Sequence, residues 1–268
     1  ASSITQGGTT ARVQASVLSL YDIDKLKGPK RGDADITWEV ADREISNQLN
    51  TIASRALPIW IVTGTIISPS TKAVVADFVA KFPTVKHIMY DANSVSGLIQ
   101  ANQASFGQAV IPSYRFDQAQ TIVSIGADFL GTWVAPLEFS RPYVETRKLG
   151  VAKKDMSRHY QFETLMSMTG SNADYRGTYK PSQEGLVVAA LYNKVASKLG
   201  GSAIGGVATT EVQHLDKAAT DLAASRGRSL VVCGSNDPNV QIVVNALNSL
   251  LGSYGTTIDL NTPLNYRQ

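Results

Sequence analysis

The chain has 268 residues, of which 43% are hydrophobic and 18% are charged, and its formal net charge is +3. A chain of this size can bury a substantial core in one domain or two closely joined lobes, and its scattered Lys and Arg do not suit a nucleic-acid-binding surface. The single cysteine, Cys233, excludes an internal disulfide and any iron–sulfur cluster or cysteine-rich zinc site built from this chain alone.

The beginning of the chain predicts a polar lead-in and a basic loop over residues 1–36, with a short strand at residues 17–21. Thr37 then suits the N-cap of a helix that ends near Arg55, because its hydroxyl can accept a hydrogen bond from the first helical turn. The apolar positions of this helix, which we expect to face the core, are Val40, Ile45, Leu49 and Ile52.

Three short runs rich in β-branched residues set the expected fold. They lead into glycine turns and span residues 59–64, 121–128 and 230–236. Continuous apolar runs of this length suit strands that are buried on both faces of a parallel sheet. We therefore predict an α/β fold of the doubly wound type, with a mainly parallel sheet and helices on both faces.

The first and third runs also predict an internal βαβ repeat. Each is followed by a helical stripe and then by a second strand, at residues 87–90 and 256–260. The first stripe consists of Val74, Val75, Phe78, Val79 and Phe82. The second consists of Val240, Val243, Val244, Leu247, Leu250 and Leu251.

The remaining segments are a mixture of helices and loops. A helix is predicted from Ser94 to about residue 107, and a loop followed by a helix over residues 128–149. Residues 157–180 are polar and lack a period, which indicates a loop. Ser182 is predicted to cap a helix that runs to about Lys198. The longest apolar stretch is too short to span a bilayer, so we expect no direct membrane insertion.

Few side chains form a recognisable catalytic or metal-binding pattern. No histidine has another His or Cys at metal-ligand spacing, and no Gly-x-Ser-x-Gly elbow presents a nucleophilic serine. His159, in the polar stretch, is the histidine that we expect to contact a ligand. The turns 126–128 and 234–236 follow strands, where open α/β sheets bind nucleotide-like ligands; they either hold a ligand or only close the sheet.

Several segments, taken in order, resemble the molybdopterin oxidoreductase superfamily. Residues 20–31 and 36–39 resemble the entry into the family's large subunit, just after its iron–sulfur segment. Residues 101–107 and 116–128 resemble the stretch from the metal-ligand region to the strand turn with Gly-x-Asn, although Asp128 stands where Asn is usual.

A third segment, residues 156–182, resembles the part that grips a guanine nucleotide of the cofactor in active members. The details at residues 128–133 and 157–160 are similar to one branch, the iron–sulfur subunit of alternative complex III. That complex is a quinol:electron-acceptor oxidoreductase, and its large subunit fuses a molybdopterin-enzyme-like region to a ferredoxin-like region. The resemblance covers most of residues 12–268.

The chain departs from the family pattern at two places that bind the cofactor. Where the family holds its metal, this chain has residues 90–94 without a thiol, so that only Asp91 or Ser94 could serve. The usual Asp-Pro-Arg is here Met156-Ser157-Arg158, which removes an acidic partner of the guanine edge while Arg158 remains. Losing a buried hydrogen-bond partner costs a site much of its affinity.

The resemblance implies cofactor-binding positions, either vestigial or functional, on the polar turns. They are Gly126, Asp128, Arg158, His159, Thr169, Asn172, Asp174, Gly234 and Asn236. No catalytic residue is assigned, and we expect the chain by itself not to be catalytic. We expect it to hold no cofactor, the alternative being molybdopterin guanine dinucleotide; iron–sulfur clusters are expected in flanking polypeptide.

These inferences predict a structural and docking domain in a respiratory electron-transfer complex on the periplasmic side of the inner membrane. The resemblance implies three partners: a ferredoxin-like iron–sulfur region, a multihaem cytochrome and membrane subunits. Two alternatives remain: a domain of an active molybdopterin-dependent oxidoreductase, and an unrelated α/β ligand-binding module. We expect a fragment of a larger subunit, with the α/β region at residues 37–268 in two lobes, 37–200 and 201–268.

Overall fold

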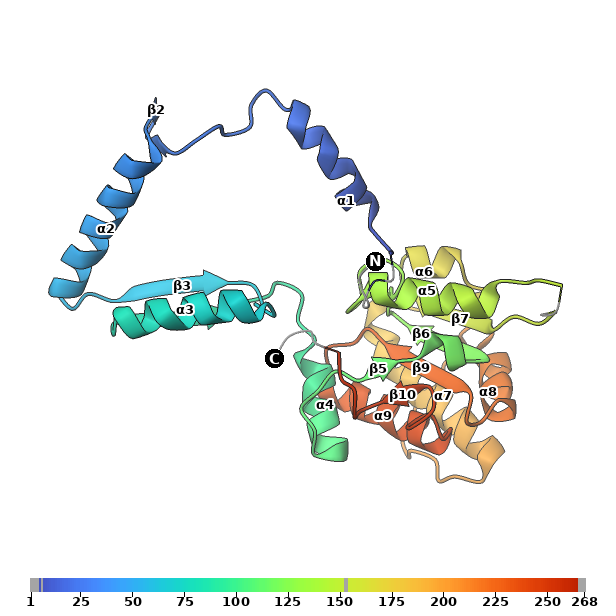
Figure 1. Ribbon diagram of the computed structural model, residues 1–268. Helices are drawn as coiled ribbons and strands as arrows, with labels where there is room; N and C mark the ends of the chain where they lie inside the picture. The colour runs from blue at the N-terminus through green and yellow to red at the C-terminus, as the bar shows by residue number, and fades with distance from the viewer. Residues whose placement is uncertain (1–4, 6, 152–153, 265–268) are drawn as a thin grey trace. The chain divides into compact units, whose positions relative to one another are not determined.

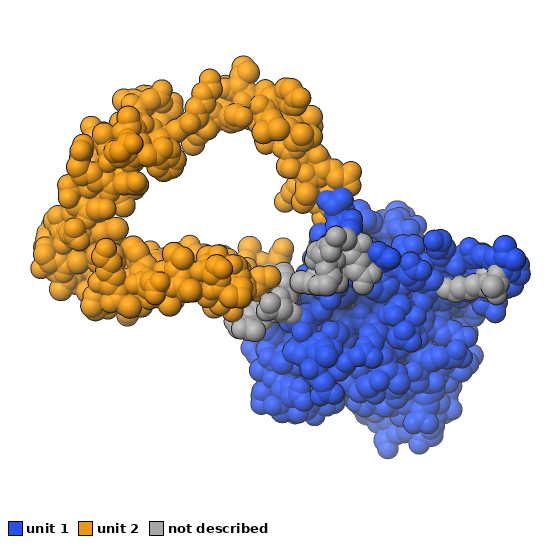
Figure 2. Space-filling model, in the orientation of Figure 1, with its two compact units in different colours: residues 1–9, 94–264 blue, residues 10–93, 265–268 orange. Residues whose placement is uncertain are grey.

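The computed structural model describes residues 5, 7–151 and 154–264, which belong to two compact units (Figures 1 and 2). Unit 1 consists of residues 1–9 and 94–264, and unit 2 of residues 10–93 and 265–268. The chain thus divides between residues 93 and 94, whereas the predicted lobes divided near residue 200.

Unit 1 is built on a parallel sheet of four strands in the order β8-β7-β6-β9. The strands are β6 (Thr121–Ile125), β7 (Arg158–Glu163), β8 (Tyr175–Thr178) and β9 (Ser229–Cys233). In the register, Val123 of β6 lies between Tyr160 of β7 and Val231 of β9. Every residue of β6 and β9 is buried, as predicted for strands covered on both faces.

Helices cover both faces of this sheet (Figure 1), so the predicted α/β class is confirmed. On one face, Val123, Phe162 and Val231 pack into a core with residues of three helices. On the other face, Tyr143 of α5 contacts His159 of β7. The helices of unit 1 are α4 (Ser96–Phe106), α5 (Pro136–Arg147), α6 (Met168–Ser171), α7 (Glu184–Leu199), α8 (Leu215–Ala224) and α9 (Pro238–Leu250), with the 3₁₀-helices η2 (Phe116–Gln118) and η3 (Pro181–Gln183).

Two sequence predictions for unit 1 are wrong. The stretch 157–180 contains strands β7 and β8 rather than a loop, and its apolar pattern is hidden because His159 and Gln161 occupy buried strand positions. Ser182 does not cap a helix; it lies inside η3, and α7 begins at Glu184 after Gln183 as N-cap.

The predicted βαβ repeat is also wrong in its last strand. Strand β10 (Ile258–Asp259) does not join the parallel sheet; it pairs antiparallel with β5 (Ser113–Tyr114) in a separate ladder. The cause lies in the loop between α9 and β10, where Ser253 and Thr257 both donate hydrogen bonds to the carbonyl of Ser229. These hydroxyls occupy the outer edge of β9, where the second strand of a repeat would have to pair.

Unit 2 contains one parallel strand pair, β3 (Ile59–Thr63) with β4 (Val85–Met89), connected by α3 (Pro69–Lys81). The elements before it are α1 (Ala11–Ala15), the 3₁₀-helix η1 (Ser16–Tyr21), the antiparallel pair β1 (Lys30–Arg31) and β2 (Ala34–Asp35), and α2 (Trp38–Ser54). The strand predicted at residues 17–21 is therefore wrong. Thr37 does cap α2, accepting a bond from Val40 N, and Arg55 is its C-cap.

Burial in unit 2 is far lower than the sequence predicted. Strand β3 is covered on one face only, because Trp60 and Val62 remain 51% and 66% exposed. In α2 only Ala41 is buried, and Ile45 is 57% exposed rather than facing a core. The other predicted core positions of α2, Val40, Leu49 and Ile52, are only partly buried. Within the described part of unit 2, no element covers the outer face of β3.

Candidate functional site: the carboxyl edge and the opposite pocket

The sheet of unit 1 reverses its strand order between β6 and β9, which is where α/β folds bind ligands at the carboxyl ends of strands. The two predicted turns meet here. The Gly234 N–H donates to the Ile125 carbonyl over 2.8 Å, and a Cβ on Gly234 would lie 2.3 Å from the Gly126 oxygen. Gly126 itself has φ +63°, a conformation that favours glycine. The two glycines therefore allow the backbones to close on each other.

Asp128 and Thr169, two further predicted site residues, are bonded to each other at this edge. The Asp128 Oδ1 atom accepts hydrogen bonds from the Thr169 backbone N–H and from its hydroxyl, at 3.0 and 2.8 Å. The Thr169 hydroxyl oxygen in turn accepts from Leu130 N at 2.9 Å. Thr169 is fully buried, so this pair joins the β6 turn to the start of α6.

Side chains from neighbouring elements complete the closure of the carboxyl edge. Tyr179 donates to Glu184 Oε1 at 3.1 Å, and that oxygen would lie 2.7 Å from a Cβ on Gly126. Asn236 Oδ1 accepts from the Gly97 N–H at 2.9 Å, which ties the β9 turn to the start of α4. The polar groups of this edge thus bond within the chain.

His159 lies in the interior rather than in a ligand-facing loop. It is completely buried on β7, and its Nδ1 is 3.0 Å from the Tyr143 hydroxyl, which also donates to the Asn172 carbonyl. Burial, together with the positive charge of Arg147, lowers the pKa of His159 to about 3. The imidazole is therefore neutral at physiological pH, and its Nε2 has no hydrogen-bond partner among the described residues.

The other predicted site residues do not join this edge. Asn172 is the C-cap of α6, and its side-chain amide donates to the Met168 carbonyl at 2.9 Å. Asp174 precedes β8 at the amino end of the sheet, where it accepts two bonds from Arg147 at 2.7 and 2.8 Å. Burial alone would raise the pKa of Asp174, but the bonds from Arg147 and the backbone of His159 outweigh it and lower the pKa.

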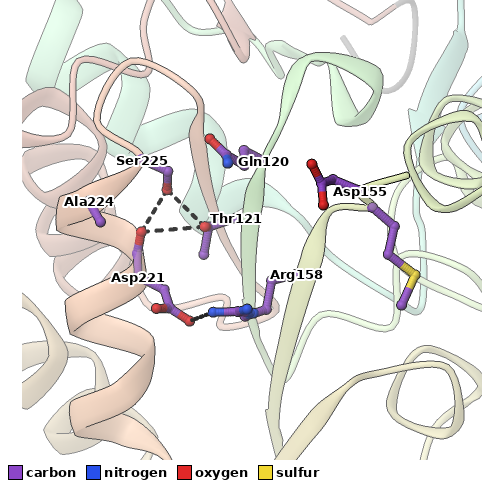
Figure 3. Close-up of a pocket in the computed structure, with 8 residues that line it drawn as sticks. Gln120, Thr121, Asp155, Arg158, Asp221, Ala224 and Ser225 are labelled. Atoms are coloured by element: carbon purple, nitrogen blue, oxygen red, sulfur yellow. Dashed lines mark hydrogen bonds and ion pairs between the residues drawn. The ribbon is translucent and has the colours of Figure 1, made fainter. Parts of the chain in front are cut away.

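Arg158 also lies at the amino end, in a pocket of about 260 Å³ (Figure 3). Its guanidinium points to Asp221 of α8, with Nη1 and Oδ2 separated by 2.7 Å, and the Tyr160 hydroxyl donates to the same carboxylate. Burial would raise the pKa of Asp221, but these two partners lower it. The pocket is lined by Gln120, Thr121, Asp155, Met156, Arg158, Asp221, Ala224 and Ser225.

No pattern in the sequence indicates Asp221 as a partner of Arg158, because the two residues are 63 positions apart and meet only when α8 packs against β6 and β9. The hydroxyls in the pocket are also engaged. Ser225 donates to the Asp221 carbonyl at 2.7 Å, and its oxygen lies 2.8 Å from Thr121 Oγ1, from which it can accept. The pocket is charged and polar, which suits a small polar molecule. The hydrogen-bond partners of its hydroxyls are carbonyl and hydroxyl oxygens, which cannot act as the general base that a nucleophilic hydroxyl needs.

The surroundings of Asp91 and Cys233 indicate that both side chains serve the fold: Asp91 bonds to a neighbouring turn, and Cys233 is buried. The Asp91 carboxylate accepts bonds from the backbone and hydroxyl of Thr65, at the carboxyl ends of β3 and β4. Burial raises the pKa of the Cys233 thiol to about 12.

In the described residues, no group of three or more His, Cys, Asp or Glu is arranged to hold a metal ion. No helix in those same ranges has the length and apolar character needed to cross a membrane.

No family model and no curated protein matches this chain. Several solved structures are similar in fold, and two of them are described here. Acetylene hydratase from Pelobacter acetylenicus is 12% identical with a TM-score of 0.57, covering 96% of this chain and 40% of that chain. The formyltransferase/hydrolase complex FhcABCD from Methylorubrum extorquens, in complex with methylofuran, is 13% identical with a TM-score of 0.50, covering 85% and 57%. This chain therefore spans 40–57% of the structures that it resembles.

Proposed function

We propose that this chain is a molybdopterin-oxidoreductase-like domain that has lost the cofactor and serves as a structural and docking element of a membrane-associated respiratory electron-transfer complex. The observation that carries the proposal is the filled carboxyl edge of unit 1. There Asp128 is bonded to Thr169, Asn236 to Gly97, and the Gly126 turn lies beneath Glu184. The fold similarity to acetylene hydratase is compatible with this assignment.

The residues at this edge fit the closed arrangement better than they fit a bound pterin dinucleotide. A ligand between the β6 and β9 turns would have to separate Gly234 from the Gly126 carbonyl. A ligand that reached between the β6 turn and α6 would have to break the two bonds between Asp128 and Thr169. Each bond broken without replacement leaves a buried polar group unpaired, at a cost of about 1–3 kcal/mol.

Two residues at the positions that the resemblance assigns to guanine binding, Arg158 and Met156, also lie away from this edge. Arg158, which the resemblance would place against the nucleotide, lies at the amino end of β7, and its guanidinium is neutralised by Asp221. Met156 lines the same amino-end pocket in place of the family's acidic residue. A dinucleotide at the carboxyl edge would therefore receive neither the charge of Arg158 nor an acidic partner, and we assign no cofactor-dependent step to this chain.

Metal and pterin analysis of the natively purified assembly tests this proposal. We expect molybdenum and tungsten far below one atom per chain by elemental mass spectrometry, and no fluorescent pterin after oxidative extraction. Native mass spectrometry should show the chain in a stoichiometric assembly with haem- and cluster-carrying proteins. Stoichiometric molybdenum with extractable pterin would contradict the loss of the cofactor, and a chain that purifies alone would contradict the docking role.

A further inference from the structure

We draw no further inference here: the strongest candidate, the apolar groove between α3 and β4 of unit 2, carries none, because nothing in the described residues shows what covers it.

Discussion

Strands β9 of unit 1 and β4 of unit 2 are both outer strands of a parallel sheet, but the chain treats their open edges differently. Along β9, Asn248 accepts from the Val231 N–H at 3.1 Å and donates to the Val231 carbonyl at 2.8 Å. Gln241 donates to the Cys233 carbonyl at 2.9 Å. Along β4, the outward groups of His87 and Met89 form no such bonds among the described residues.

The same contrast holds for the faces of the two sheets. The residues of β9 are all buried, whereas Trp60 and Val62 of β3 are more than half exposed. Unpaired strand edges and exposed apolar faces are unfavourable in water and are normally covered or blunted. Unit 1 thus pairs the outward backbone groups of Val231 and Cys233 and buries both faces of β9. Among the described residues, unit 2 leaves the outward groups of β4 unpaired and one face of β3 exposed.

The largest expected effect comes from matched truncations of the two sheets. Phe162→Ala removes a fully buried ring from the core of unit 1, and we expect it to lower the free energy of unfolding by about 3–5 kcal/mol. Val62→Ala, on the exposed face of β3, should change it by no more than about 0.5 kcal/mol.

Urea unfolding followed by the fluorescence of Trp133, which lies in unit 1, measures the effect of Phe162→Ala. The exposed Trp38 and Trp60 are replaced by Phe in that background to isolate the signal. Val62→Ala is measured in a separate background that keeps Trp60 as the reporter of unit 2. Equal effects of the two truncations would contradict the contrast between a self-contained and an incomplete sheet.

Acid should weaken unit 1 through His159. The folded pKa is about 3 and the ordinary value 6.5, so between these pH values the unfolded state binds a proton that the folded state does not. Above about pH 6.5, His159 therefore does not lower the free energy of unfolding. Below that pH the free energy of unfolding falls by at most about 1.4 kcal/mol per pH unit. The lowered pKa values of Asp174 and Asp221 add a further loss below about pH 4.

The pH dependence is measured by urea unfolding of unit 1 between pH 7.5 and about pH 4. His159→Gln lacks the titrating ring, so its stability, although lower at pH 7, should be nearly constant between pH 6.5 and 4.5. A wild-type profile as flat as that of the variant would mean that folding does not lower the pKa of His159.

The glycines at the ends of β9 and β3 provide a third comparison. Gly234→Ala places a Cβ 2.3 Å from the Gly126 carbonyl oxygen, and we expect a loss of about 1–3 kcal/mol because two backbones must separate. Gly64→Ala places a Cβ at an ordinary 3.4 Å from Asp91 and should cost less than about 0.5 kcal/mol. Thermal unfolding of both variants measures the two losses of stability. If Gly234→Ala does not lower the stability, the carboxyl edge can open.

The smallest expected effect concerns the edge of β9. Asn248→Ala leaves the Val231 N–H and carbonyl without their side-chain partner, and we expect a loss of about 1 kcal/mol. The Val231 amide should also exchange faster with deuterium in the variant. If its exchange is unchanged, Asn248 does not protect this edge, and the contrast with β4 would be weaker than we infer.

Sequence patterns alone located the parts of the fold in which local preference and burial agree. The β-branched runs at β6 and β9 and the Thr37 cap of α2 were predicted correctly, because each depends on residues close together in the chain. Patterns of this kind also brought Gly126 and Gly234 into consideration, since glycine at the end of a buried strand permits a tight turn.

Tertiary structure decided what the sequence patterns could not. His159 was predicted to lie in a polar loop, but it is buried on β7 against Tyr143 of α5. Arg158 meets Asp221 only after α8 packs against β6 and β9. Apolar periodicity likewise predicts a buried stripe but not the surface that buries it, which is why β3 and α2 are exposed here. Apolar periodicity indicates which face of an element is hydrophobic. Which other element packs on that face depends on residues distant in the sequence.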